Sequence, residues 1–248
     1  MKTIKSLIIL SLVLMLGGQM MGQKTTHGSM FLSAAFPVGD YADGDKMQDI
    51  ALGGLDDEGG AGIGGNIGFK WNFGVGVPGL GVMLSLDGFF NGPNGDMKDY
   101  YKTVANEWEV GFNNVTVRSP KYFNVPVMLG VHYCYDFNPQ FGIYAEAGAG
   151  GDLRLITNYT QQGLSKIGNL KEKLVNHYSP AFSFAYQVGV GIEVSKSLVI
   201  GCSFYDLGGA DVKVDKSWVH EGNTETTVSE TLGRVHPMMI LARIGFAF

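Results

Sequence analysis

The last twelve residues of the chain, Pro237 to Phe248, constrain the fold more than any other stretch. Counted back from the end, every second position is apolar: Phe248, Phe246, Ile244, Ala242, Ile240 and Met238. The row between them is mixed and carries Arg243. A period of two residues predicts a β-strand whose two faces meet different environments. The apolar face runs to a terminal aromatic residue, which favours a strand that meets lipid over one that meets water.

Seven earlier runs show the same alternation: residues 28–36, 61–71, 81–90, 122–135, 141–155, 181–194 and 198–207. Most are long enough to cross a bilayer at a tilt, which takes about 9–11 residues. The connections alternate between long ones, at 37–60, 91–121, 156–180 and 208–236, and short ones, at 72–80, 136–140 and 195–197. We therefore predict an all-β fold, an eight-stranded antiparallel up-and-down transmembrane β-barrel. The short turns and both termini would be periplasmic, and the four long loops external.

The second row of each run is rich in Gly, Ala and Ser and carries isolated charges, which suits a narrow lumen better than a water-exposed face. The alternative is a soluble, ligand-carrying barrel, in which the apolar row would face inward and the polar row would face water.

The polar network expected in the lumen comprises Lys70, Asp87, His132, Glu146, Asp152, Arg154, Gln187, Glu193 and Arg243. Its acids and bases nearly balance, as a closed interior requires. An eight-stranded barrel has room for little more than side chains, so we expect a polar plug and not a channel.

The start of the chain predicts a secretory signal peptide over residues 1–22, followed by the barrel domain over 23–248. Lys2 and Lys5 precede an apolar run at 7–16 that is too short to span a membrane, and Gly22 is a small residue at the expected cut. Removal of two lysines would make the net charge of −5 more negative. A negative chain is a poor partner for nucleic acid, so none is expected.

Three residues make specific predictions about the barrel wall. Cys134 and Cys202 fall on opposite faces of strands that are not neighbours, so no disulfide is expected. Pro126 interrupts a strand that should be paired on both sides. We expect a bulge there, or a strand whose paired part begins later.

Two of the long connections carry patterns of their own. In residues 156–180, apolar side chains recur at near-helical spacing at Leu164, Ile167, Leu170 and Leu174. This spacing predicts a short amphipathic helix that covers the barrel mouth or binds a partner. The connection at 91–121 contains Tyr100, Tyr101 and Trp108, which are candidate recognition residues. Residues 110–117 could equally extend a hairpin above the membrane.

The sequence motifs favour neither a cofactor nor a metal site. No His-x-His, Cys-x-x-Cys or His-Glu-x-x-His spacing is present. The acids of the first long connection lack the spacing of a calcium loop: Asp40, Asp43, Asp45, Asp49, Asp56, Asp57 and Glu58.

Catalysis is not expected either. A lipid-modifying enzyme would need a serine, a histidine and a carboxylate together at the outer rim. His236 is the candidate histidine, and it could face Asp206 or Asp211. Such an enzyme and a small pore remain the alternatives to a non-enzymatic protein.

The predicted leader, the Phe-Pro-Val-Gly-Asp-Tyr stretch at 36–41, the run at 122–135 and the terminal Ala-Phe together resemble Bacteroidetes outer-membrane β-barrel domain proteins. The layout is similar to the PorT-like set and to OmpA/OmpX-type barrels. The resemblance implies that Ile244, Phe246 and Phe248 form a C-terminal signal for the barrel assembly machinery. It also implies a porin-like protein of the Gram-negative cell envelope, held in outer-membrane lipid. Such a protein would act as a scaffold or display loops for adhesion or for an envelope or extracellular protein partner.

Overall fold

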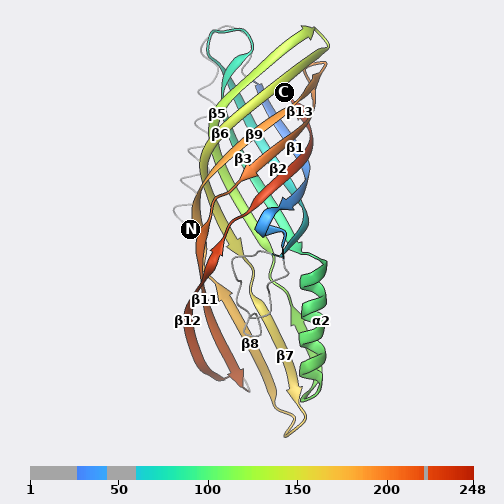
Figure 1. The fold of residues 1–248 in the computed structure, drawn as a ribbon, viewed down its shortest axis with the longest axis vertical. Helices are drawn as coiled ribbons and strands as arrows, with labels where there is room; N and C mark the ends of the chain where they lie inside the picture. The colour runs from blue at the N-terminus through green and yellow to red at the C-terminus, as the bar shows by residue number, and fades with distance from the viewer. Residues whose placement is uncertain (1–26, 44–59, 221–222) are drawn as a thin grey trace.

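The computed structural model describes residues 27–43, 60–220 and 223–248. The predicted signal peptide and five of the acids of the first long connection (Asp45, Asp49, Asp56, Asp57 and Glu58) lie outside these residues. The described chain forms a long closed barrel that continues at one end into a second sheet (Figure 1). Among the described residues, no helix combines the length and the apolar character needed to cross a bilayer.

Eight of the described strands close the barrel in the order β1-β13-β10-β9-β6-β5-β3-β2, each antiparallel to its neighbours. The strands are β1 (His27–Val38), β2 (Ala61–Gly74), β3 (Leu80–Pro93), β5 (Tyr122–Asn138), β6 (Phe141–Ile156), β9 (Ala181–Val194), β10 (Leu198–Asp206) and β13 (Met238–Ala247). The predicted all-β, eight-stranded up-and-down barrel is therefore confirmed. The terminal strand β13 closes it by pairing with β1 from Ser29–Ala247 to Val38–Met238.

The outer surface of the barrel is apolar along every strand. In β13, Ile244 is 50% exposed, whereas its neighbour Arg243 points inward and is 3% exposed. Each barrel strand contributes at least one such outward residue, 40–61% exposed: Leu32, Ile67, Leu86, Leu129, Ile143, Val188, Ile200 and Ile244. The alternation of the sequence thus separates an apolar outside from a polar inside. We call the outward apolar side chains of the eight barrel strands the belt.

The predicted bulge at Pro126 is wrong. Strand β5 stays in one register with β6 through this residue, since Val125, Pro126 and Val127 face consecutive β6 residues. On the other side, the β3–β5 pairing skips the positions opposite Asp87 and Gly88 and resumes in the same register. Proline removes only one backbone hydrogen-bond donor. The short gap in the β3–β5 pairing accommodates this missing donor, so no bulge is needed.

The two cysteines are free thiols, as predicted. Cys202 is exposed on the outer face of β10, and Cys134 packs against a buried cluster inside the barrel.

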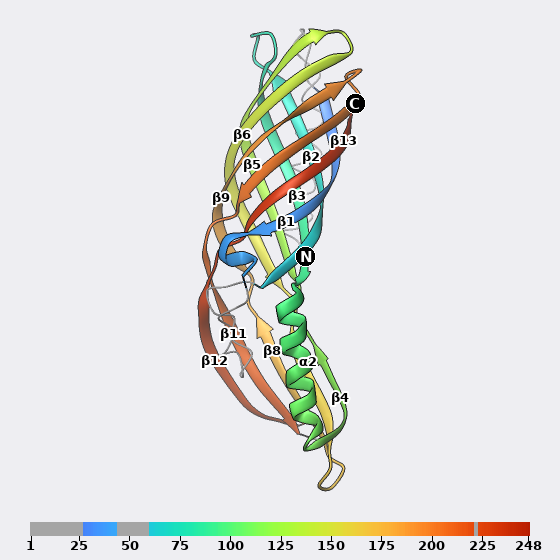
Figure 2. The same ribbon diagram turned by 45° about the vertical axis from the view of Figure 1, so that its right-hand side comes forward.

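Three of the long connections build the second sheet, which we call the extension (residues 95–118, 159–178 and 210–235). Its strand order is β12-β11-β8-β7-β4. The strands are β4 (Phe112–Arg118), β7 (Tyr159–Ser165), β8 (Lys171–Tyr178), β11 (Ala210–His220) and β12 (Asn223–Val235). A helix, α2 (Gly95–Glu109), runs beside β4, and a short 3-10 turn, η2 (Gly39–Tyr41), follows β1. Figure 2 shows the extension continuing from one end of the barrel, with the C-terminus at the opposite end.

The predicted amphipathic helix at 164–174 is wrong, because this segment is the β7–β8 hairpin. Leu164 pairs with Lys171 across the hairpin. Gly168 and Asn169 have φ of 84° and 59°, a left-handed turn that a helix cannot contain. Ile167, assigned to the apolar face of the predicted helix, is 88% exposed. Pairing of β7 with β4 and of β8 with β11 outweighs the local spacing.

The helix of the extension forms instead in the connection at 91–121. It begins after Asn94, whose side chain accepts a hydrogen bond of 2.9 Å from the backbone N–H of Met97. Asparagine is a favoured residue at this capping position. The alternative prediction, a hairpin extended by residues 110–117, is met in part by β4, which pairs with β7.

Candidate functional site

The centre of the barrel interior is an ion cluster around Glu146. This carboxylate forms an ion pair with Lys70 and lies 3.0 Å from Nη1 of Arg243. The three groups come from β6, β2 and β13 and are 5%, 2% and 3% exposed. One acid on β6 thus holds two cations from β2 and β13, the strands on either side of β1, away from water.

Hydrogen bonds extend this cluster toward the extension. Arg243 donates through Nη2 to the Tyr205 hydroxyl (3.0 Å), and Tyr205 donates to Oδ2 of Asp87 (3.0 Å). Asn66 donates to the other oxygen of Asp87 at 3.2 Å. Tyr205 and Asn66, which are predicted to point inward, complete this chain of hydrogen bonds. The period-two pattern places both on the inner face, so the alternation contains the signal for them.

Arg154 forms a second polar centre at the barrel mouth. Its guanidinium donates to the backbone oxygens of Val235 (2.5 Å) and Gly208 (3.0 Å) and lies 3.6 Å from the carboxylate of Asp152. Nε of Arg154 donates to Asn124 at 3.2 Å. Because Val235 and Gly208 lie at the boundary between barrel and extension, this one buried side chain ties the two together.

Apolar side chains close the mouth around Arg154. The largest buried apolar cluster joins residues of the barrel rim to the base of the extension: Tyr41, Phe89, Tyr122, Met128, Tyr205, Leu207, Val212, Val214, Val235, Met239 and Leu241 are among its members. The rings of Tyr41 and Tyr122 meet edge to face at 5.6 Å.

All nine residues predicted for the lumen network are buried, at 0–9% exposure, and Gln187 contacts Met83 across the interior. The interior is therefore filled with side chains.

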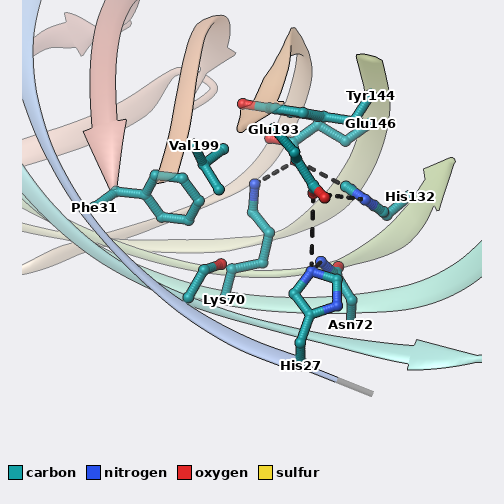
Figure 3. A pocket seen from close by; sticks show the side chains of 10 residues that line it. His27, Phe31, Lys70, Asn72, His132, Tyr144, Glu146, Glu193 and Val199 are labelled. Carbon is teal, nitrogen blue, oxygen red and sulfur yellow. Dashed lines mark hydrogen bonds and ion pairs between the residues drawn. The ribbon is translucent and has the colours of Figure 1, made fainter. Parts of the chain in front are cut away.

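The opposite end of the lumen holds a small pocket, shown in Figure 3. His27, His132 and Glu193 meet there, and one oxygen of Glu193 lies 3.9 Å from Nε2 of His27 and 3.8 Å from Nε2 of His132. The cavity beside them has a volume of about 10 Å³ and is also lined by Asn72 and Tyr144. His27 was not part of the predicted network, because it precedes the first alternating run.

The three candidate recognition residues are not equivalent. Tyr101 is only 9% exposed and packs against Tyr159 with ring centroids 5.6 Å apart, so its assignment to an exposed recognition surface is wrong. Burial raises the pKa of both phenols, which stay protonated. Tyr100 is half-buried beside Tyr101. Trp108 stacks on Phe112 at 4.6 Å and remains half-buried. The side chain of Tyr101 belongs to the core of the extension, and Trp108 borders its surface.

The three C-terminal residues that the resemblance assigns to an assembly signal lie on the outer face of the last strand and at its end. Ile244, Phe246 and Phe248 face outward and are 50%, 66% and 75% exposed. The backbone of Phe248 exchanges two hydrogen bonds with Gly28, of 2.8 and 2.9 Å. Their function as an assembly signal stays a prediction.

The rim histidine makes one of the two contacts considered from the sequence. Nε2 of His236 lies 2.6 Å from Oδ1 of Asp206, and the Tyr186 hydroxyl donates to the other oxygen of Asp206 at 2.7 Å. The contact joins an imidazole and a carboxylate at the rim of the barrel.

Comparison with solved structures finds other barrels at low similarity. Ail, the attachment invasion locus protein of Yersinia pestis, is 13% identical with a TM-score of 0.41, over 91% of this chain and 100% of that chain. A major outer-membrane protein from Thermus thermophilus is 14% identical with a TM-score of 0.42, over 91% of this chain and 99% of that chain. The outer-membrane protein AlkL is 12% identical with a TM-score of 0.37, over 93% of each chain. The sequence matches no protein-family model and no curated protein.

Proposed function

We propose that this protein is a non-enzymatic integral outer-membrane protein, in which a sealed barrel anchors the extension outside the cell for partner binding. The observation that carries the proposal is the inverted surface. The belt covers all eight barrel strands, whereas Lys70, Glu146 and Arg243 are inside. In water this arrangement would expose a large apolar surface, which soluble monomers avoid. In lipid it is the arrangement that a spanning barrel requires.

Aromatic residues support this placement because they gather at both ends of the belt. Near the extension lie Phe36, Phe90, Phe123, Phe182, Phe184 and Tyr186, and near the short turns lie Tyr133, Tyr135, Phe137, Phe141, Phe246 and Phe248, all of them 37–75% exposed. Spanning barrels carry such girdles at the two membrane interfaces. The bilayer would therefore end where the extension begins.

The filled interior favours an anchor over a pore. The Glu146 cluster crosses the middle of the lumen, and the Arg154 centre with its apolar surroundings closes the mouth. Eight strands leave space for side chains and little else. Passage of a solute would require these buried ion pairs to separate, which is unfavourable because each partner would remain unpaired.

The far end of the extension supports a role in binding a protein partner. Val110 and Ile167 are 81% and 88% exposed there. The two lie close together, because Lys166 donates to the backbone oxygens of Glu109 and Gly111. Trp108 precedes Val110 by two residues, and its ring lies 5.9 Å from that of Trp218. Exposed apolar residues next to aromatic ones on a rigid support are typical of protein interfaces.

The signal peptide at 1–22, recognition of Phe248 and its neighbours by the assembly machinery, and a Bacteroidetes-type origin belong to the same proposal. The periplasmic position of both termini follows from it, because the described chain begins and ends at the barrel end that carries the short turns.

Labelling of single cysteines on intact cells tests the proposed orientation. In a background with Cys134 and Cys202 replaced by serine, we expect Ile167→Cys to react with a membrane-impermeant maleimide on intact cells. The matched variant is Val77→Cys, in the turn between β2 and β3, where Val77 is 53% exposed. It should react only after the outer membrane is permeabilised. The reverse pattern, or a protein absent from the outer-membrane fraction, would refute the proposed function.

A further inference from the structure

The pocket at the turn end of the lumen gathers three potential metal ligands from three separate strands. His27 begins β1, His132 lies in β5 and Glu193 lies near the end of β9. In the closed barrel no two of these strands are neighbours. Figure 3 shows the three side chains converging from different parts of the wall. A group that bound all three would connect the barrel wall across the lumen.

The distances suit a small cation. The Glu193 oxygen is 3.9 Å from Nε2 of His27 and 3.8 Å from Nε2 of His132, and one ligand atom from each residue lies within 4.8 Å of the others. Around a tetrahedral zinc ion with bonds of 2.0–2.1 Å, ligand atoms lie about 3.3 Å apart. Side-chain rotations that close these gaps by about 1 Å would complete the site.

His132 has an unmet requirement at this position. Its side chain is 5% exposed and stacks on Tyr144, yet neither ring nitrogen has a hydrogen-bond partner. Buried polar groups are normally hydrogen-bonded, and each exception calls for an explanation. A metal at Nε2 would supply the missing partner. On the other side of the ring, Glu146 lies 3.8 Å from Nδ1 and is placed to orient the imidazole, as carboxylates do for zinc-bound histidines.

The charge of the interior points the same way. Among the predicted lumen residues, the acids Asp87, Glu146, Asp152 and Glu193 outnumber the bases Lys70, Arg154 and Arg243 by one. Lys70 and Arg243 pair with Glu146, and Arg154 pairs with Asp152. Within the described residues, the ion-pair partners of Glu193 are only the two histidines. In the same part of the chain, Asp87 also has no lysine or arginine partner, but it accepts hydrogen bonds from Tyr205 and Asn66. The carboxylate of Glu193 instead lies between the two imidazoles.

The remaining space is also of the right size and polarity. The cavity of about 10 Å³ has the volume of roughly one water molecule or ion. Asn72 borders it, and its amide nitrogen lies 3.1 Å from Nε2 of His27 while its amide oxygen has no hydrogen-bond partner. Rotation of this amide would free Nε2 of His27 and turn the oxygen toward a bound cation.

We propose that His27, His132 and Glu193 bind one divalent first-row transition-metal ion, with zinc as the best fit. Two imidazole nitrogens and one carboxylate oxygen form a donor set that zinc accepts, with water or Asn72 in the fourth position. The ion ties β1, β5 and β9 together and holds the beginning of β1 against the lumen. This site is independent of the partner bound by the extension.

Direct titration of zinc tests the site. Untagged protein, folded in detergent and stripped with a chelator, is titrated with Zn²⁺ by calorimetry and with Co²⁺ by visible spectroscopy. We expect one equivalent to bind, with the intense visible bands of four-coordinate Co²⁺. His132→Ala and Glu193→Gln should each weaken binding at least about tenfold, since even residues outside the metal ligands change affinity 10–100-fold. Stoichiometric zinc should raise the unfolding temperature of the wild type only.

The other histidines provide the control. His236→Ala and His177→Ala change residues near the other end of the barrel, where the extension begins, and should leave zinc affinity unchanged. If His132→Ala does not fold, as judged by heat-modifiable gel mobility, His27→Ala replaces it, because His27 is only half-buried at the start of β1. A wild type that binds no zinc, or one whose binding survives these lumen variants and is lost in His236→Ala, would overturn the proposal.

Discussion

Replacement of Glu146 by alanine is expected to destabilise the folded barrel by about 3–5 kcal/mol, the usual effect of removing one partner of a buried ion pair. The carboxylate holds both Lys70 and Arg243 in the lumen, and all three are at most 5% exposed. Without it, two cations remain buried with no acid between them. Asp87 is the nearest alternative, but it already accepts from Tyr205 and Asn66.

Urea titration in lipid vesicles, followed by tryptophan fluorescence and by gel mobility of unboiled samples, measures this loss. Lys102→Ala is the matched control, because Lys102 pairs with Asp99 on α2 where both side chains are more than 70% exposed. Exposed pairs contribute little, so its effect should stay below about 1 kcal/mol. If Glu146→Ala were as mild as Lys102→Ala, the ion cluster would not stabilise the barrel.

Replacement of Leu129 by arginine is expected to destabilise the protein by about 2–4 kcal/mol in a bilayer, the effect of a charge at the middle of a lipid-facing strand. Leu129 is 61% exposed in the middle of β5 and pairs with Leu84 and Ala149. In a soluble barrel the same substitution would place the charge in water and would be nearly neutral. The size of this loss of stability therefore distinguishes a lipid-facing belt from a water-facing one.

Val110→Arg provides the comparison for Leu129→Arg. Val110 is 81% exposed and lies in the extension, so an arginine there should change stability by no more than about 0.5 kcal/mol. Both variants are measured by urea titration in the same vesicles. Equal, small effects at the two positions would contradict the membrane placement of the belt.

The barrel could be predicted because the residues of each strand alternate between an apolar outer face and a more polar inner face, and this alternation is visible in the sequence. In β13, the alternation of Ile244 with Arg243 and Gly245 predicts which side chains point outward and which point into the lumen. The same rule places Glu146 and Lys70 inside, and an eight-stranded interior is narrow enough that inward charges must meet. Which charged side chains form ion pairs with one another depends on the register of the strands. That register is fixed only when the sheet closes.

The extension could not be predicted because its elements depend on one another. The spacing of Leu164 and Leu174 fits a helix as a local pattern, yet pairing with β4 and β11 selects a hairpin. Tyr101 gives no local sign that Tyr159, from another connection, covers its ring. Local propensity decides less where long-range pairing supplies the partners.

The candidate metal ligands illustrate the same limit. His27, His132 and Glu193 are far apart in the sequence and form no short motif. They meet because β1, β5 and β9 all reach the same end of a closed barrel. A search for short ligand spacings rejects a metal site here, whereas the geometry supports one.

Refolding with and without lipid tests the central claim most directly. Protein denatured in urea is diluted into buffer alone or into buffer with lipid vesicles, and folding is followed by circular dichroism and by the mobility of unboiled samples on gels. The belt predicts a folded, heat-modifiable barrel only when vesicles are present, and aggregation in buffer alone. A monomeric, folded barrel in buffer alone would contradict the account, because the apolar outer surface would then be stable in water.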